Sequence, residues 1–289
     1  MTPIQWFYSF LRQYKWKMFW GLVLVTILAI ASLVNPYISG MIVDDVINGG
    51  KTGMLPYLIA FLLGTIIVKG LCRFFSQVLF EVSSQGVLYS MRDKVYRKLL
   101  QEDFAFYNKN RTGDLMSRQT GDMDAIRHFV AYVIYIVYEN ILYFVFALLM
   151  IFKTDWKLAL CMLPAIPLTA LTTMSQSKNV HPAFGRCRQA FSSLNTYVQE
   201  NISGNRVVKA FAKEDYEMEK FAVENDGYRD AELGAAKIWR RYVPLFEFWS
   251  NLLTIVLMLV GGWMVIRGEI TMGNFVTING YLWMLTQPL

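Results

Sequence analysis

Long, nearly uncharged apolar runs constrain this chain more than any other feature of its sequence. Six such runs lie at 19–42, 55–80, 128–152, 158–173, 242–266 and 272–289. A helix needs about 20 apolar residues to cross the hydrocarbon core of a bilayer, where every backbone polar group must be satisfied internally. Apolar residues make up 55% of the chain and charged residues 17%, and the charges concentrate between the runs. The sequence therefore predicts an all-α integral membrane protein with six transmembrane helices.

The N-terminal residues 3–14 precede the first run and have a pattern of their own. Apolar side chains recur there at helical spacing, at Ile4, Phe7, Leu11 and Tyr14. This pattern predicts an interfacial helix lying on the membrane. The alternative is a cleaved signal peptide ending near Ala29-Ile30-Ala31, but the apolar run continues beyond that point to residue 42.

The distribution of basic residues predicts the orientation. Of the 28 Lys and Arg, only four lie in the short connections between runs: Lys51, Lys153, Lys157 and Arg267. The others, apart from Lys69 and Arg73, lie in the N-terminal segment and in two long connections, 81–127 and 174–241. Because basic residues favour the cytoplasmic side, we expect the N-terminus and both long connections to be cytoplasmic in a multi-pass protein of the cell membrane.

Two other function classes find no support. The net charge is +6, but lysines and arginines alternate with acids along the polar segments, so no basic stripe for nucleic acid forms. The three cysteines, Cys72, Cys161 and Cys187, are scattered and form no metal-binding or disulfide pattern.

The two long connections each predict a helical hairpin that extends the membrane helices into the cytoplasm. Each is polar and rich in helix-forming residues, with a glycine-bearing break expected at 111–114 and at 202–205. Arms of roughly 20–30 residues would project about 30–45 Å at 1.5 Å per residue. We expect short amphipathic helices at the tips, over 113–119 and 204–211.

The expected tips present apolar side chains far from lipid. The residues that we expect to couple the arms to a partner are Gly113, Asp114, Leu115, Met116 and Arg118 in the first arm, and Gly204, Val207, Val208 and Phe211 in the second. Two explanations fit: the arms pack against each other, or they dock onto a separate cytoplasmic protein.

Three groups of motifs in the polar segments and the last run carry a family resemblance. They read FYN, TGDLMSR and GDMD within 106–124, QENISG and RVVKAF with Glu214 within 199–214, and GEITMG and QPL within 268–289. In this order they resemble the first intracellular loop, the second intracellular loop and the sixth helix of ABC exporters. The resemblance covers essentially the whole chain.

The resemblance implies a dimer of six-helix units whose arms cross to the other half. The tip helices would seat on nucleotide-binding domains, and ATP-driven closure of those domains would switch the cavity from inward to outward facing. The expected partners are a second exporter half, nucleotide-binding domains, membrane lipids and an amphiphilic cargo of drug-like, lipid or peptide type, with no nucleic acid.

The chain departs from a complete exporter because it contains no phosphate-binding loop of the form GxxxxGK[ST]. The stretch 204–209 lacks the second glycine and the Ser or Thr. We therefore expect no catalytic residue, no metal site and no cofactor in this chain, and a separate or following domain that uses ATP and magnesium. The last run is still apolar at Pro288-Leu289, so we expect the natural protein to continue.

Candidate cargo-contact residues lie on two runs. Glu139 is an acid in the middle of an apolar run, and Tyr132, Tyr135 and Tyr143 share its face at helical spacing. This stripe would suit a lipophilic cation in a cavity, while a hydrogen bond from Glu139 to a neighbouring helix is the alternative. Another polar stripe recurs on the last run, at Asn279, Trp283 and Gln287.

Two basic residues also lie within an apolar run, Lys69 and Arg73, one helical turn apart. The sequence favours a snorkelling role for both, in which the charged ends reach the lipid headgroups.

The function that the whole pattern favours is the cargo-translocating domain of an ATP-driven exporter. A multi-pass channel or sensor with a cytoplasmic signalling partner is the alternative.

Overall fold

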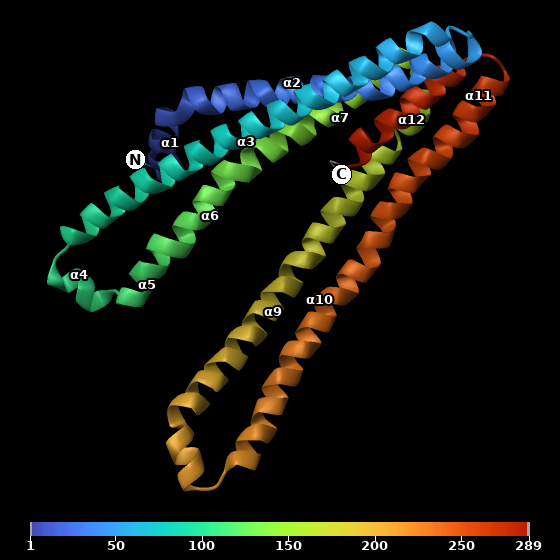
Figure 1. The fold of residues 1–289 in the computed structure, drawn as a ribbon. Helices are drawn as coiled ribbons and strands as arrows, with labels where there is room; N and C mark the ends of the chain where they lie inside the picture. The colour runs from blue at the N-terminus through green and yellow to red at the C-terminus, as the bar shows by residue number, and fades with distance from the viewer. Residues whose placement is uncertain (1, 288–289) are drawn as a thin grey trace. The chain divides into compact units, whose positions relative to one another are not determined.

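The computed structural model describes residues 2–287, and within that range the chain is helical and contains no strand (Figure 1). Five continuous helices are long and apolar enough to cross a membrane: Pro3–Asn48, Thr52–Leu100, Thr112–Thr154, Trp156–Ala210 and Glu214–Ile266. A sixth helix, α12 (Met272–Thr286), ends next to the last described residue. The all-α, multi-pass prediction is confirmed, and part of the sixth predicted span, Pro288-Leu289, lies outside the described residues.

Two compact units divide the chain, one formed by residues 2–159 and 257–287 and the other by residues 160–256. The elements of the first unit are α1 (Pro3–Leu11), α2 (Lys15–Met41), α3 (Leu55–Leu100), α4 (Phe104–Lys109), α5 (Thr112–Ser117), α6 (Met123–His128), α7 (Ile134–Thr154), α11 (Gly262–Ile266) and α12. Those of the second are α9 (Ala165–Ala210) and α10 (Glu214–Val256), and α8 (Trp156–Met162) spans the boundary.

Within the first unit, α2 packs against α3, α7 and α12. A polar bond joins it to each of these helices. The bonds run from Thr65 to Asn35 Oδ1 (3.1 Å), between the hydroxyls of Thr26 and Tyr138 (2.9 Å), and from the Tyr281 hydroxyl to the Leu33 carbonyl (2.9 Å). Such bonds stabilise helix association in a bilayer, where lipid offers no hydrophobic driving force between helices.

The backbones of α2 and α12 approach each other closely. A Cβ atom built on Gly273 would lie 2.3 Å from the carbonyl oxygen of Gly40 and 2.4 Å from the Asp44 carboxylate. The Asp44 carboxylate in turn accepts a 2.7 Å hydrogen bond from the Gly273 amide at the start of α12. Small residues are common where membrane helices meet because they let two backbones approach closely.

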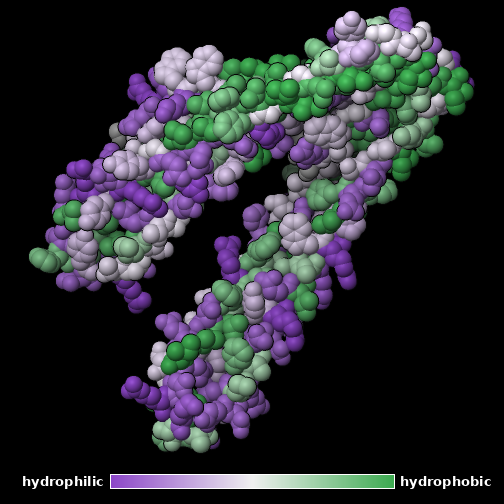
Figure 2. Space-filling view, in the orientation of Figure 1, coloured by the Kyte–Doolittle hydropathy of each residue, from purple (hydrophilic) through white to green (hydrophobic). Residues whose placement is uncertain are grey.

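The N-terminal helix packs on the first arm. Thr2 caps α1 through its side chain, and Phe10 is buried among Val87, Leu88 and Met91 of α3. Phe7, Leu11 and Tyr14 of the predicted apolar stripe pack against this cluster, whereas Ile4 is 79% exposed. The stripe therefore contacts the protein along most of its length. Figure 2 shows apolar surface over the membrane-spanning stretch of α3 and polar surface over its extension.

The first arm bends where the sequence predicts and at one further point. Arg111 has extended backbone and precedes α5, in agreement with the predicted break. Another break follows α3, where Asp103 caps the six-residue helix α4. The tip of this arm is therefore α4, and residues 113–119 lie at the start of the returning helix.

The predicted break at 202–205 in the second arm is wrong. Helix α9 continues through Gly204 to Ala210, because a single glycine in a long helix costs only about 1 kcal/mol. The chain reverses after Phe211, where Ala212 adopts a positive φ of 48° and the Lys213 amide bonds to the Val208 carbonyl. Glu214 and Asp215 then begin α10 with acidic residues that favour a helix N-terminus. Residues 204–211 are thus the end of α9 rather than a separate helix.

The second unit is a long antiparallel pair of helices. Ala183, Cys187 and Ala235 form a small buried cluster in its arm. Near its membrane end, the Tyr242 hydroxyl lies 2.8 Å from both the Ser175 hydroxyl and the Asn179 side chain.

We expect Gly273→Ala to lower the thermal stability of the protein, because the added methyl group would force α12 away from the Gly40 carbonyl. A loss of about 1–3 kcal/mol is typical of overpacking at such a contact. Thermal unfolding in nanodiscs, followed by tryptophan fluorescence, measures the change. Gly262→Ala is the control, because a Cβ atom there meets nothing within 4 Å. Equal melting temperatures for the two variants would contradict the packing of this contact.

Candidate functional site

Glu139 lies on α7 with its carboxylate directed at α3. Its side chain is 9% exposed, and its Oε1 atom accepts a 2.5 Å bond from the guanidinium of Arg73. The Arg73 side chain therefore bonds to a carboxylate and does not only extend to the lipid headgroups. An opposite charge stabilises an ionised side chain within an apolar span. The bond between neighbouring helices, the alternative that the sequence left open for Glu139, is present.

The three candidate tyrosines of α7 have different surroundings. Tyr135 is buried and lies 5.5 Å from the Phe80 ring, measured between ring centroids. Tyr132 is 41% exposed and lies against His128 at 5.0 Å. Tyr143 is buried and meets α12. Only Tyr132 of the three therefore presents a substantial surface in the single chain.

The two predicted stripes meet at one pair of rings. Tyr143 of α7 and Trp283 of α12 form an edge-to-face contact with ring centroids 5.7 Å apart. Asn279, Trp283 and Gln287 are all exposed and follow one another at helical spacing. This ring pair therefore connects one α7 candidate, Tyr143, with one α12 candidate, Trp283, within the first unit.

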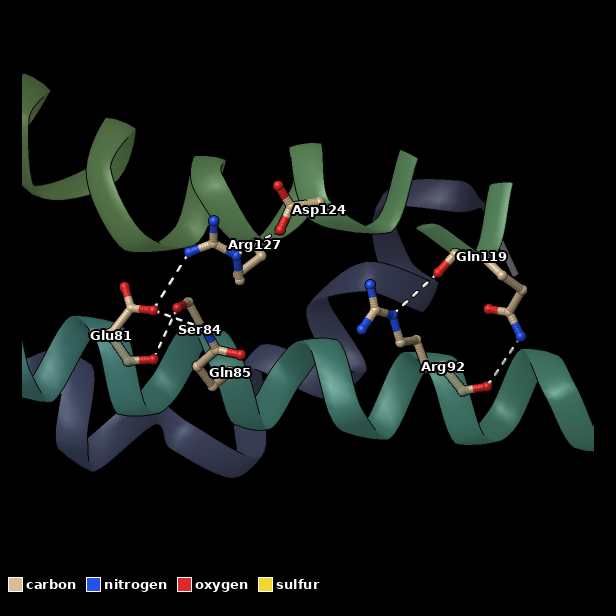
Figure 3. Close-up of polar contacts among 7 residues, drawn as sticks. All are labelled: Glu81, Ser84, Gln85, Arg92, Gln119, Asp124 and Arg127. Carbon is tan, nitrogen blue, oxygen red and sulfur yellow. Dashed lines mark hydrogen bonds and ion pairs between the residues drawn. The ribbon is translucent and has the colours of Figure 1, made fainter. Parts of the chain in front are cut away.

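In the first arm, two arginines hold the returning helix against α3 (Figure 3). The Arg92 side chain donates to the Gln119 carbonyl at 3.1 Å. Arg127 bridges Glu81 of α3 and Asp124 of α6, at 3.3 and 2.7 Å. The hydrogen bond from Arg127 lowers the pKa of Asp124 because it stabilises the ionised carboxylate. Neither arginine was singled out from the sequence, because the contacts that cross to the other helix, Arg92 to Gln119 and Arg127 to Glu81, join residues far apart along the chain.

These contacts set the predicted coupling residues of the first arm on a fixed helix. Four of them are exposed and one is half-buried: Gly113, Asp114, Met116 and Arg118 are exposed, and Leu115 is half-buried. The returning helix can thus offer Met116 to a partner without losing its contact with α3.

The end of the second arm exposes apolar side chains. Val207 is 61% and Phe211 73% exposed, while Gly204 and Val208 are half-buried. Val208 also lines a groove of about 410 Å³ between α9 and α10, together with Tyr197 and Glu217. The Tyr197 hydroxyl donates to the Glu217 carboxylate at 2.6 Å. Tyr197 and Glu217 were missed from the sequence because they belong to different helices of the hairpin.

Comparison with known proteins identifies the family. The family model described as ABC transporter transmembrane region matches residues 18–289. The chain belongs to this ABC transporter family. It is 31% identical, over 94% of its length, to an uncharacterised ABC transporter ATP-binding protein, YknU, of Bacillus subtilis. It is 29% identical over 90% of its length to an ATP-dependent lipid A-core flippase of Syntrophus aciditrophicus, and 28% identical over 95% to the multidrug resistance-like protein MdlA of Escherichia coli.

The chain spans about half the length of these relatives. It covers 48% of YknU, 43% of the lipid A-core flippase and 47% of MdlA. Its helical architecture is that of an ABC exporter transmembrane domain. Among residues 2–287, no group of three or more His, Cys, Asp and Glu side chains is placed to hold a metal ion.

We expect Tyr197→Phe to raise the pKa of Glu217, which the Tyr197 hydroxyl holds below its ordinary value. A lowered carboxyl pKa stabilises the fold above the ordinary value of about 4.3, and this contribution is lost as the pH falls through the lowered pKa. NMR titration of carbon-13-labelled glutamate, with Glu217→Gln for assignment, measures the change. Tyr216→Phe, at an exposed tyrosine of the same hairpin, is the control. An unchanged Glu217 titration in Tyr197→Phe would show that the hydrogen bond does not form.

Proposed function

We propose that this chain is the cargo-translocating transmembrane domain of an ATP-driven exporter of amphiphilic molecules. Family membership supports transport, and it speaks against the channel or sensor alternative. Two of the relatives are named as a lipid A-core flippase and a multidrug resistance-like protein, and a lipid is an amphiphile. Drug-like, lipid and peptide molecules share this character.

The observation that carries the proposal is the apolar end of the second arm. Phe211 is 73% exposed at the end of a helix that begins at Ala165. At 1.5 Å per residue, roughly 60 Å of helix separates Phe211 from the end of the apolar run at 158–173. An exposed phenylalanine beside Val207 at that distance from lipid needs a protein partner to cover it. We assign this partner to a nucleotide-binding domain, with the arms and N-terminus in the cytoplasm.

Cargo would meet the surface at which α7 and α12 join. Trp283 is 44% exposed beside buried Tyr143, and Asn279 and Gln287 give the same face of α12 polar groups. Aromatic rings with a few polar groups suit an amphiphile, because the rings contact its tail while the amides bond its head. A second copy of the domain, or a related half, would complete the cavity within the surrounding lipid.

ATP and magnesium would act on the nucleotide-binding domains. Because this chain has no GxxxxGK[ST] loop, we expect purified residues 1–289 in lipid to show no magnesium-dependent ATP hydrolysis. A phosphate-release assay against a protein-free nanodisc blank measures this. Turnover above the blank that persists through further purification would contradict the expectation.

We expect Phe211→Ala in the full-length transporter to weaken docking of the nucleotide-binding domain by about 1–3 kcal/mol, the range for truncating a buried anchor residue. Transport should fall several-fold while basal ATP hydrolysis and cargo affinity remain. Vesicle transport, ATPase and cargo-binding assays measure the three quantities.

The matched control is Phe184→Ala, because Phe184 is a 43% exposed phenylalanine earlier in α9, away from the end of the arm. It should leave the coupling of ATP hydrolysis to transport unchanged. If Phe211→Ala instead removes cargo binding and leaves coupling intact, the second arm has been assigned the wrong role.

A further inference from the structure

Three charged side chains gather in the apolar part of the first unit, and together they carry an excess positive charge. Arg73 of α3 bonds to Glu139 of α7, so those two charges compensate each other. Lys69 lies one helical turn before Arg73 and is half-buried. No ion pair of Lys69 is found in the part of the chain that the structure describes. The trio of Lys69, Arg73 and Glu139 therefore holds two cations and one anion.

This arrangement is costly unless something else binds to it. Side chains four residues apart on a helix are neighbours, and two like charges at that spacing destabilise the helix. A cation within an apolar span also costs several kcal/mol of desolvation. Glu139 cannot compensate both cations, and its side chain is only 9% exposed behind the Arg73 bond. The trio lacks one negative charge.

The guanidinium of Arg73 is able to accept a second anionic partner. A guanidinium carries five N–H donors in a planar fork, and the bond to Glu139 uses only one of its nitrogens. The Arg73 side chain is 45% exposed, so its remaining donors are accessible in the single chain. A Cβ atom built on Gly70, which lies between the two cations, would meet nothing within 4 Å. No neighbouring atom of the described chain therefore covers the helix backbone at this point.

Apolar side chains flank the two cations along α3. Val68 is 45% and Leu71 53% exposed, and the Phe74 and Phe75 rings are 60% and 52% exposed. An anionic headgroup bound to Lys69 and Arg73 would place its hydrocarbon tail beside these side chains. A free inorganic anion would gain nothing from them.

We propose that Lys69 and Arg73 form a binding site for the anionic headgroup of an amphiphile, such as an alkyl phosphate, and that Glu139 tunes this site by competing for Arg73. The inference rests on the proposed export of amphiphiles and adds the charge of the preferred cargo. It reverses the cationic preference that Glu139 suggests when it is considered without its partner. The headgroup could belong to a transported molecule or to a resident bilayer lipid.

The test measures binding of three fluorescent probes with the same chain length to the full-length protein in phosphatidylcholine nanodiscs. One probe is a dodecyl phosphate, one a dodecyl trimethylammonium and one a neutral dodecanol. We expect Lys69→Gln to weaken binding of the phosphate probe roughly tenfold, the effect of losing one charge-assisted hydrogen bond. The cationic and neutral probes should bind as before.

Glu139→Gln provides the opposite change, because it releases the Arg73 guanidinium while keeping the size of the side chain. It should strengthen binding of the phosphate probe several-fold. Lys51→Gln is the matched control. It removes a lysine whose side chain is 60% exposed and which lies in a short connection outside the apolar runs. Repeating the titration with phosphatidylglycerol in the nanodiscs separates the two sources: a lipid occupant competes with the probe, and a transported one binds despite the lipid.

Two results would overturn the inference. One is an unchanged phosphate affinity in Lys69→Gln, which is what a lysine that only reaches the headgroup layer would give. The other is an equal loss of all three probes, which would show a general effect on folding or on the cavity. In either case, binding of the neutral and cationic probes to the unchanged protein would still support the proposed export of amphiphiles. Failure of the unchanged protein to bind any of the three probes would count against the proposed function itself.

Discussion

Close contact between α2 and its neighbours is the constraint on which the first unit depends. Within a bilayer the tails of lipids are as apolar as the side chains of the helices, so burial alone does not drive two helices together. Association then depends on close packing and on hydrogen bonds between helices. Helix α2 supplies both: Gly40 admits the backbone of α12, and Asn35 and Thr26 bond to α3 and α7. These contacts position α7 and α12, the helices that carry the proposed cargo-binding residues, although none of those residues makes them.

Much of this fold could be predicted from the sequence because apolar runs and their flanking charges report directly on the membrane. The six runs, the long helical extensions and the family all follow from patterns that are local in the chain. The break before α5 was also predictable, since Thr112 and Gly113 follow a stretch with turn-forming residues. Local patterns served well wherever a single helix determined the outcome.

The errors arose where two segments determine the structure together. Gly204 indicated a break in the second arm, but α9 tolerates this one glycine and the chain reverses later, at Ala212. The acidic residues that begin α10 favour a turn at this later position. For Glu139 the sequence left a cavity role and a bond to a neighbouring helix both open, because its partner Arg73 lies on another helix, far away in the sequence. Pairing between helices sets the electrostatics of a membrane domain, and periodicity along one helix contains no information about it.

The hydroxyl of Tyr242 has a mechanical consequence for the second unit. It bonds to both Ser175 and Asn179, and the Trp249 ring nitrogen bonds to Thr172 one step farther along the hairpin. These bonds join α9 and α10 near their membrane end, while the turn at Ala212 joins them at the far end. Two helices fastened at both ends cannot slide past each other without breaking a fastening. A force applied at Phe211 would therefore be expected to move α9 and α10 together as one rigid arm, instead of sliding one helix along the other.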